Sequence, residues 1–228
     1  MSDYLQSRLD AAFPASADVE LVRAVHQGIG LADSVVENEV WLRGPIGRDV
    51  RGYLRRAGIL SRLSAACVAG DLPFEAIIEQ MPRGPFHWLE LRSGGLKAHV
   101  CRTDSAGAFP DDTPTRQDER LPNPQGDLFE GKVVSLKQAS AAVPNLFAWL
   151  SFGAPEGGQL GHLCWAMPAQ DGQSWLAHTN VLYRLAAAQI QVVPEVPPER
   201  AKIKFRDEIA ESLKTPEGAA NENRGKKD

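Results

Sequence analysis

The sequence lacks the features that mark several protein classes. It has only three cysteines, an odd number that forms no disulfide framework and suits a reducing compartment. No apolar run approaches the roughly 18 residues that a membrane-spanning helix needs. Residues 1–6 show no basic start followed by an apolar stretch, so they do not resemble a secretory signal. These absences predict a cytoplasmic protein without a membrane segment.

Short motifs that would identify common enzymes are also missing. The chain contains no Gly-x-x-x-x-Gly-Lys-Ser/Thr loop, no dinucleotide fingerprint and no Gly-x-Ser-x-Gly elbow. What remains is an ordinary globular composition: 228 residues, of which 43% are hydrophobic and 24% charged. This length suits one large domain or two small ones.

The pattern of apolar residues predicts an α+β fold with three regions. A helical region over residues 1–82 contains its strongest helix at 46–69 and a shorter one at 74–81. An antiparallel β-sheet with a covering helix at 173–188 follows in residues 83–193. A proline-containing linker, an amphipathic helix and a charged, disordered tail make up residues 194–228. Residues 103–131, rich in proline, are expected to form a long surface loop.

Two β-hairpins of similar sequence are predicted within the sheet. The first joins strands 86–92 and 96–102, and the second joins strands 146–153 and 159–167. Both follow the order Trp-Leu-x-apolar, Gly-Gly, small-His-apolar-Cys, and glycine tolerates the backbone of such turns. The likeness indicates either a pseudo-symmetric sheet or a chance match between core strands of similar composition.

The matched hairpins supply a candidate metal site. His99 and Cys101 are two residues apart on one strand and therefore point to one side of the sheet, as do His162 and Cys164. If these strands converge, the four side chains are a sufficient set for tetrahedral zinc. The alternative is that the cysteines are small buried hydrophobes and the histidines bond to backbone carbonyls. No other cofactor is expected.

The same histidines support a catalytic hypothesis. One could act as general base and the other as general acid on a phosphodiester. The paired motifs are similar to the His-x-Thr or His-x-Ser pairs of the 2H phosphoesterases, and this resemblance implies catalytic roles for His99 and His162; Cys101 and Cys164 stand in place of the hydroxyls. A metal-dependent nuclease using Asp127, Glu130 and Lys132, with Asp111 and Asp112 upstream as further acidic ligands, is another alternative. A solvated acidic loop is the competing interpretation.

Charge is unevenly distributed along the chain. Residues 43–62 hold six arginines against one acid, a local charge of +5, whereas residues 104–130 hold seven acids against two arginines, a local charge of −5. On a helix the arginines would form a guanidinium face that suits the phosphates of DNA or RNA. A solvated face, or one neutralised by the acidic segment, is the alternative. The candidate nucleic-acid-binding residues are Arg48, Arg51, Arg55, Arg56 and Arg62.

These observations favour a non-enzymatic binding protein, a regulatory or accessory subunit that contacts nucleic acid through the arginine helix. A protein partner is expected at residues 199–213, where Phe205, Ile209 and Leu213 recur at i, i+4 and i+8 on one helical face. The phosphodiesterase or nuclease centred on His99 and His162 is the competing hypothesis.

Overall fold

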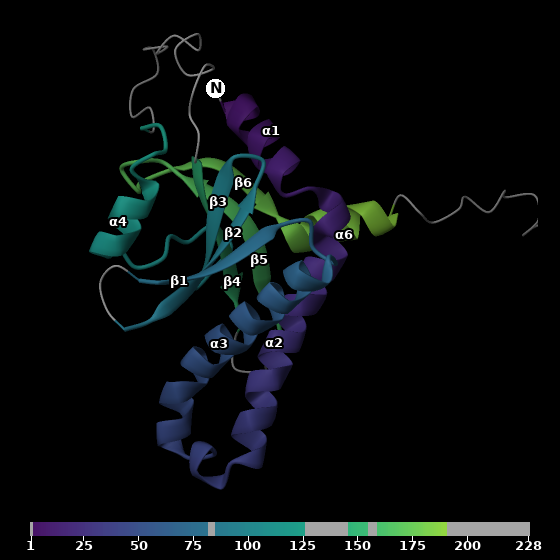
Figure 1. Ribbon diagram of the computed structural model, residues 1–228, viewed down its shortest axis with the longest axis vertical. Coiled ribbons are helices and arrows are strands. Elements are labelled where there is room, and N and C mark those ends of the chain that lie inside the picture. The colour runs from purple at the N-terminus through teal and green to yellow at the C-terminus, as the bar shows by residue number, and fades with distance from the viewer. Residues whose placement is uncertain (1, 82–84, 126–145, 155–158, 191–228) are drawn as a thin grey trace, which may run out of the picture. The chain divides into compact units, whose positions relative to one another are not determined.

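The protein has the predicted α+β architecture (Figure 1). The computed structural model describes residues 2–81, 85–125, 146–154 and 159–190. Short 3-10 turns at Ala15–Ala17 and Val40–Leu42 connect the first helices. The helices are α1 (Ser2–Ala12), α2 (Asp18–Asn38), α3 (Pro45–Ala69), α4 (Pro114–Arg120) and α6 (Val181–Ile190); the strands are β1 (Glu75–Gln80), β2 (His87–Ser93), β3 (Leu96–Arg102), β4 (Leu146–Gly153), β5 (His162–Pro168) and β6 (Trp175–Asn180).

The six strands form one sheet in chain order, β1-β2-β3-β4-β5-β6. All neighbouring pairs are antiparallel except β3 and β4, which run parallel. The expectation of a purely antiparallel sheet is therefore corrected at this one pair. A parallel pair needs a long crossover between its strands, and residues 103–145 provide it.

The two predicted hairpins are present and lie side by side. β2 and β3 pair through a turn in which Gly94 and Gly95 have φ of 55° and 77°, the left-handed region that glycine adopts at little cost. β4 and β5 pair antiparallel. In the register of β3 with β4, His99 lies opposite Trp149. The histidines of the two hairpins are therefore not neighbours.

Three predicted elements are wrong in type. Residues 74–81 form strand β1 instead of a helix, and the β-branched pair Ile77-Ile78 favours that conformation. Residues 173–188 form strand β6 followed by α6, because the apparent helical spacing spans the junction of two elements. The segment 103–131 contains helix α4, where Thr113 caps the helix and Pro114 occupies its first turn.

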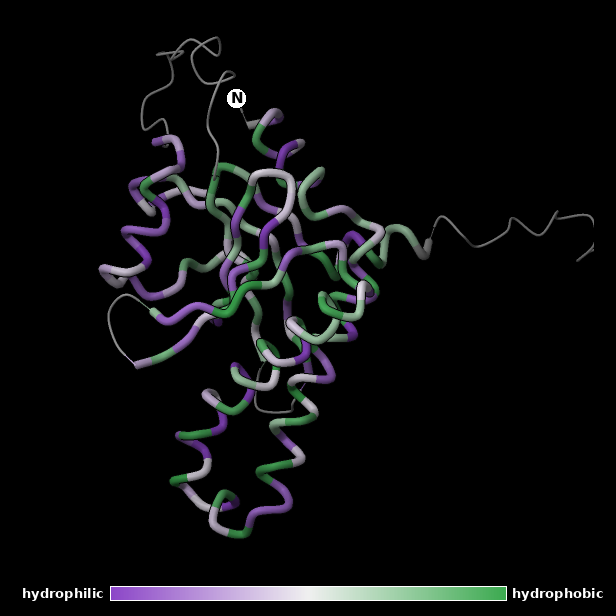
Figure 2. The backbone as a smooth tube through the Cα atoms, in the orientation of Figure 1, coloured by the Kyte–Doolittle hydropathy of each residue, from purple (hydrophilic) through white to green (hydrophobic). Residues whose placement is uncertain are grey.

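Helices α1, α2 and α3 cover one face of the sheet and build the main core. Phe13 stacks on Trp165 with ring centroids 3.8 Å apart, and Phe74 meets both rings edge-on. Along α2 and α3 the hydrophobic and hydrophilic residues alternate, as Figure 2 shows, so that each helix has a buried stripe. The opposite face of the sheet is covered by α4 and the segment that precedes it.

Where α2 and α3 cross, glycines allow the two backbones to touch. A Cβ atom at position 58 would lie 2.3 Å from the carbonyl oxygen of Gly28, and one at position 28 would lie 2.5 Å from the Cα of Ile59. No other residue fits at this distance. Gly58 lies inside α3 and does not interrupt the helix.

Among the described residues, no helix combines the length and apolar character required to cross a membrane. The predicted partner-binding residues Phe205, Ile209 and Leu213 lie outside the described part of the chain. So do Asp127, Glu130 and Lys132 of the nuclease alternative.

Candidate ligand-binding cleft

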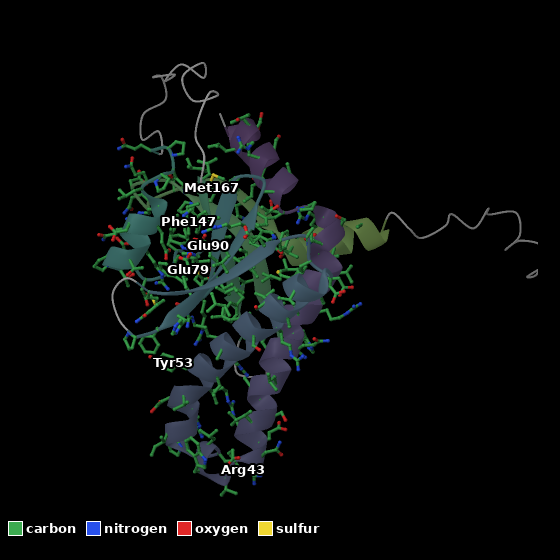
Figure 3. The ribbon with its side chains drawn as sticks, viewed as in Figure 1. Arg43, Tyr53, Glu79, Glu90, Phe147 and Met167 are labelled. Atoms are coloured by element: carbon green, nitrogen blue, oxygen red, sulfur yellow. The ribbon has the colours of Figure 1, made fainter. Side chains whose placement is uncertain are left out.

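A row of side chains crosses the outer face of the sheet, and two of them, His99 and Trp149, line a cleft. Residues opposite one another on paired strands project to the same face, and Glu90, His99 and Trp149 are paired in this way across β2, β3 and β4. Glu119 reaches this row from α4. The sheet residues Glu90 and Phe147 lie near each other in Figure 3.

His99 is held between two carboxylates. Its Nδ1 lies 2.8 Å from Glu119 Oε1 and its Nε2 lies 3.3 Å from Glu90 Oε2. Only 6% of His99 and 3% of Glu90 is exposed. The Trp88 ring stacks on the imidazole at 4.2 Å between centroids, and the Trp149 indole N–H donates to Glu119 Oε2. Both imidazole nitrogens are therefore occupied.

The carboxylates favour the charged form of His99. Burial by itself lowers the pKa of His99, but hydrogen bonds to Glu119 and Glu90 outweigh it, and the pKa is raised above the ordinary 6.5. The hydrogen bond from His99, helped by Arg92, lowers the pKa of Glu90 to about 2 although burial opposes this. The three groups form a buried acid–imidazolium–acid triad. A histidine so engaged has no free nitrogen for proton transfer.

The triad makes stability depend on pH. A raised folded-state pKa means that His99 stabilises the fold fully below its unfolded value of about 6.5, and that this contribution is lost as pH rises through the folded value. Glu90 acts oppositely, its contribution being lost as pH falls toward about 2. We expect the free energy of unfolding to decrease as pH rises above about 6.5, measured by urea titration. In His99→Gln this decrease should shrink; profiles that remain parallel would contradict the triad.

A cleft of about 600 Å³ opens above the triad. Such a volume lies within the range of ligand sites. Its walls come from α3, from β2 and β3, and from residues 103–119. The indole N–H of Trp88 is buried and has no hydrogen-bond partner within the described ranges. Aromatic rings are contributed by Tyr53, Phe86, Trp88, Phe109 and Trp149.

Three guanidinium groups also line this cleft, on Arg56, Arg102 and Arg116. Arg56 donates to the carbonyl oxygen of His87 at 3.1 Å, and Arg116 donates to that of Asp111. Burial, and after it the positive charge of Arg116, lowers the pKa of Arg56. Within the described residues none of the three forms an ion pair with a carboxylate. The positive charges of Arg56 and Arg116 therefore interact unfavourably across the cleft.

Carboxylates are present in the cleft as well, but they are placed differently. Asp104 and Asp111 are exposed, whereas Glu119 is taken up by His99 and Trp149. The cations thus remain available to an anion that enters between α3 and α4.

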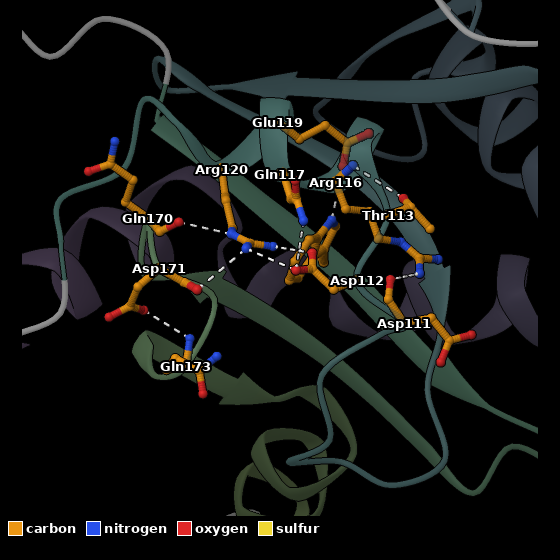
Figure 4. A network of polar contacts seen from close by, with 11 residues as sticks. Asp111, Asp112, Thr113, Arg116, Gln117, Glu119, Arg120, Gln170, Asp171 and Gln173 are labelled. Carbon is orange, nitrogen blue, oxygen red and sulfur yellow. Dashed lines mark hydrogen bonds and ion pairs between the residues drawn. The ribbon is translucent and has the colours of Figure 1, made fainter.

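A second set of polar contacts fixes α4 against the sheet (Figure 4). Arg120 is buried, and its guanidinium donates to Asp112 Oδ1 at 2.6 Å and to the carbonyl oxygen of Gln170 at 2.9 Å. Gly172, with φ of 69°, lies directly against this guanidinium. Because α4 also carries Arg116 and Glu119, this anchor positions both of these residues in the cleft.

The structure does not bring the candidate zinc ligands together. Cys101 and Cys164 lie in register on either side of Ser151, hence two strand spacings apart, roughly 10 Å. Burial raises the pKa of the Cys101 thiol to about 12 and that of Cys164 to about 11, so both stay protonated. No group of three metal-ligating side chains occurs in the described ranges.

His162 lies in a different cavity from His99. Its Nε2 lies 2.9 Å from Thr103 Oγ1, and burial, followed by the charge of His178, lowers its pKa. The histidines are two strand spacings apart across the sheet and four residues apart along it, which places them roughly 16 Å from each other on the same face. At this separation they do not meet on one phosphodiester.

The five candidate arginines of α3 do not share one exposed face. Arg55 is buried and forms a bidentate pair with Asp33, and it also donates to the carbonyl oxygen of Ala154. Arg51 is half-buried, and its Nε has no hydrogen-bond partner within the described ranges. Arg48 and Arg62 are exposed. Of the five, Arg56 is the one that lines the cleft.

Sequence reasoning missed Arg102 and Arg116. Arg116 sits in the segment interpreted as an acidic loop, where only the Thr113-Pro114 capping signal marks a helix. Comparison with known proteins gives no further guide to the cleft: no family model, no curated protein and no solved structure matches the chain.

Proposed function

We propose that the protein is a non-enzymatic binding protein whose cleft holds single-stranded nucleic acid. The observation that carries this proposal is the meeting of Arg56 and Arg116 across the cleft without a carboxylate partner. A phosphate between them would accept two hydrogen bonds from each fork and relieve their repulsion.

The aromatic walls favour a single strand over a duplex. Bases that are not paired expose their faces and stack on tryptophan, tyrosine and phenylalanine rings, whereas duplex bases are buried in their own stack. Tyr53 is 68% and Phe86 58% exposed, and both line the cleft with Trp88. Because the whole chain carries a net charge of −4, we expect contact to be confined to this surface.

A second cavity supports a ligand longer than one nucleotide. It measures about 540 Å³ and shares Arg102, Thr103 and Asp104 with the first, so the two cavities adjoin. Its far side is lined by His162 and by Tyr183, which is 76% exposed. A nucleic-acid strand that runs through both cavities would pass Arg102 at their junction and would meet an aromatic side chain at each end.

Replacing both Arg56 and Arg116 by alanine tests this function. Each charged hydrogen bond contributes about 1.5–3 kcal/mol, so affinity for a labelled oligonucleotide should fall at least tenfold in fluorescence anisotropy. Loss of two contacts to a single strand should also reduce the slope of log K against log salt by about 1.4. Thermal unfolding should be unchanged.

Arg62→Ala is the matched control, because it removes the same charge from an exposed site on the same helix outside the cleft. Its affinity and salt slope should match those of the unaltered protein. The proposal fails if the double variant binds as tightly as the control, or if the unaltered protein binds no single strand.

A further inference from the structure

The two cavities meet at the end of β3, where a cation and a carboxylate stand two residues apart. Arg102, Thr103 and Asp104 line both cavities. Arg102 and Asp104 are exposed, whereas Thr103 is buried and its hydroxyl is hydrogen-bonded to His162. In the part of the chain that the structure describes, neither Arg102 nor Asp104 forms an ion pair. Both charged groups are therefore available to a ligand that extends from one cavity into the other.

The walls of the two cavities differ in their chemistry. The first cavity is lined by five phenylalanine, tyrosine and tryptophan side chains. The second has a single tyrosine, Tyr183, and is lined as well by Ser105 and Asn180, whose side chains exchange hydrogen bonds with hydroxyl groups. The first cavity thus suits the faces of bases, and the second suits the sugar and phosphate groups of a strand.

A carboxylate at the junction is unfavourable for a chain of phosphates. When ionised, Asp104 only accepts hydrogen bonds, and its negative charge repels every phosphate that passes it. The backbone of DNA has no hydroxyl along its length that could offset this repulsion. The backbone of RNA carries a 2′-hydroxyl on each nucleotide, and this group donates as well as accepts. The same carboxylate therefore has opposite consequences for the two sugars.

We propose that the cleft selects RNA over single-stranded DNA, with Asp104 accepting a hydrogen bond from a ribose 2′-hydroxyl while Arg102 binds a neighbouring phosphate. This inference rests on the proposed function and names the nucleic acid that the site takes. A cation and a carboxylate side by side match the acceptor and the donor that a ribonucleotide backbone presents. Selectivity follows because Asp104 weakens binding of the strand that lacks the hydroxyl.

Binding of three labelled octamers, followed by fluorescence anisotropy, tests this selection. Oligomers of uridine and deoxyuridine carry the same base and differ only at the 2′ position, so donors on the base contribute equally to both. We expect the uridine octamer to bind at least tenfold more tightly, as for one hydrogen bond to a charged group. The 2′-O-methyluridine octamer keeps the sugar oxygen but has no donor there, and it should bind as weakly as the deoxyuridine octamer.

Asp104→Asn connects the selection with this carboxylate. The amide removes the negative charge, so the deoxyuridine octamer should bind more tightly than it does to the unaltered protein, and the two affinities should become nearly equal. Asp71→Asn is the matched control, because Asp71 is exposed and lines neither cavity; it should keep the preference of the unaltered protein. Thermal unfolding of both variants should be unchanged.

The outcomes separate this inference from the function on which it rests. Equal affinity of the unaltered protein for the uridine and deoxyuridine octamers overturns the selection of RNA and leaves the proposed function standing. A preference for uridine that persists in Asp104→Asn overturns the role of the carboxylate. If none of the three octamers binds, the proposed function is wrong, and the inference is wrong with it.

Discussion

His99→Ala is expected to lower the free energy of unfolding by roughly 3–5 kcal/mol, the cost of breaking a buried ion pair by removing one partner. The substitution leaves two carboxylates, Glu90 and Glu119, facing each other without the cation that separates them. It also removes the ring on which Trp88 stacks. Equilibrium unfolding in guanidinium chloride, followed by tryptophan fluorescence, measures the loss.

His26→Ala provides the comparison, because His26 is exposed on α2. Its effect should be within about 0.5 kcal/mol, as for ordinary surface substitutions. A loss below about 1 kcal/mol for His99→Ala would match a solvent-exposed pair and would contradict the buried triad. Removing the negative charges should reduce this loss. In a Glu90→Gln and Glu119→Gln background, His99→Ala should lower the free energy of unfolding by less than it does in the unaltered protein.

Gly58→Ala is expected to destabilise the protein by about 3 kcal/mol, at the upper end of the cost of overpacking a core. The added methyl would lie 2.3 Å from a backbone oxygen of α2, so the helices must separate instead of a side chain moving aside. Alanine gains about 1 kcal/mol of helix propensity over glycine, which offsets only part of this cost. Thermal and denaturant unfolding measure the result.

Gly30→Ala is a matched control for the same chemical change. Gly30 lies inside α2, and a Cβ there meets no atom within 4 Å. Stability should therefore increase by about 0.5–1 kcal/mol. If Gly58→Ala proves as stabilising as Gly30→Ala, the close approach of α2 and α3 at this crossing is incorrect.

Local sequence signals predicted much of the fold. The Gly94-Gly95 turn and the period-two alternation beside it located the first hairpin, since both act over a few residues. The edge strand of the sheet was harder to predict from the sequence. β1 is an exposed edge strand that lacks regular alternation, and its identity depends on pairing with β2. The parallel pairing of β3 with β4 joins residues about fifty positions apart, for which a single sequence contains no direct signal.

Some residues of the site were predictable from the sequence, but their arrangement was not. Sequence reasoning selected His99 and Arg56, both of which lie at the cleft. The partners that decide their roles, Glu119 and Arg116, come from α4, and tertiary packing alone brings them there. Arg55 shows the reverse: its spacing on the helix suited a phosphate contact, whereas its buried pairing with Asp33 is fixed by the neighbouring helix.

The parallel β3–β4 pair has a consequence for the order of folding. Each antiparallel hairpin closes a short loop, whereas Leu96 and Leu146 must meet although they are fifty positions apart in the chain. Closing a longer loop costs more chain entropy before any contact compensates for it. We therefore expect the hairpins to form early and the parallel pair to join them late. The same late step brings Trp149 beside His99 and against α4. The cleft is therefore completed only when the sheet is complete.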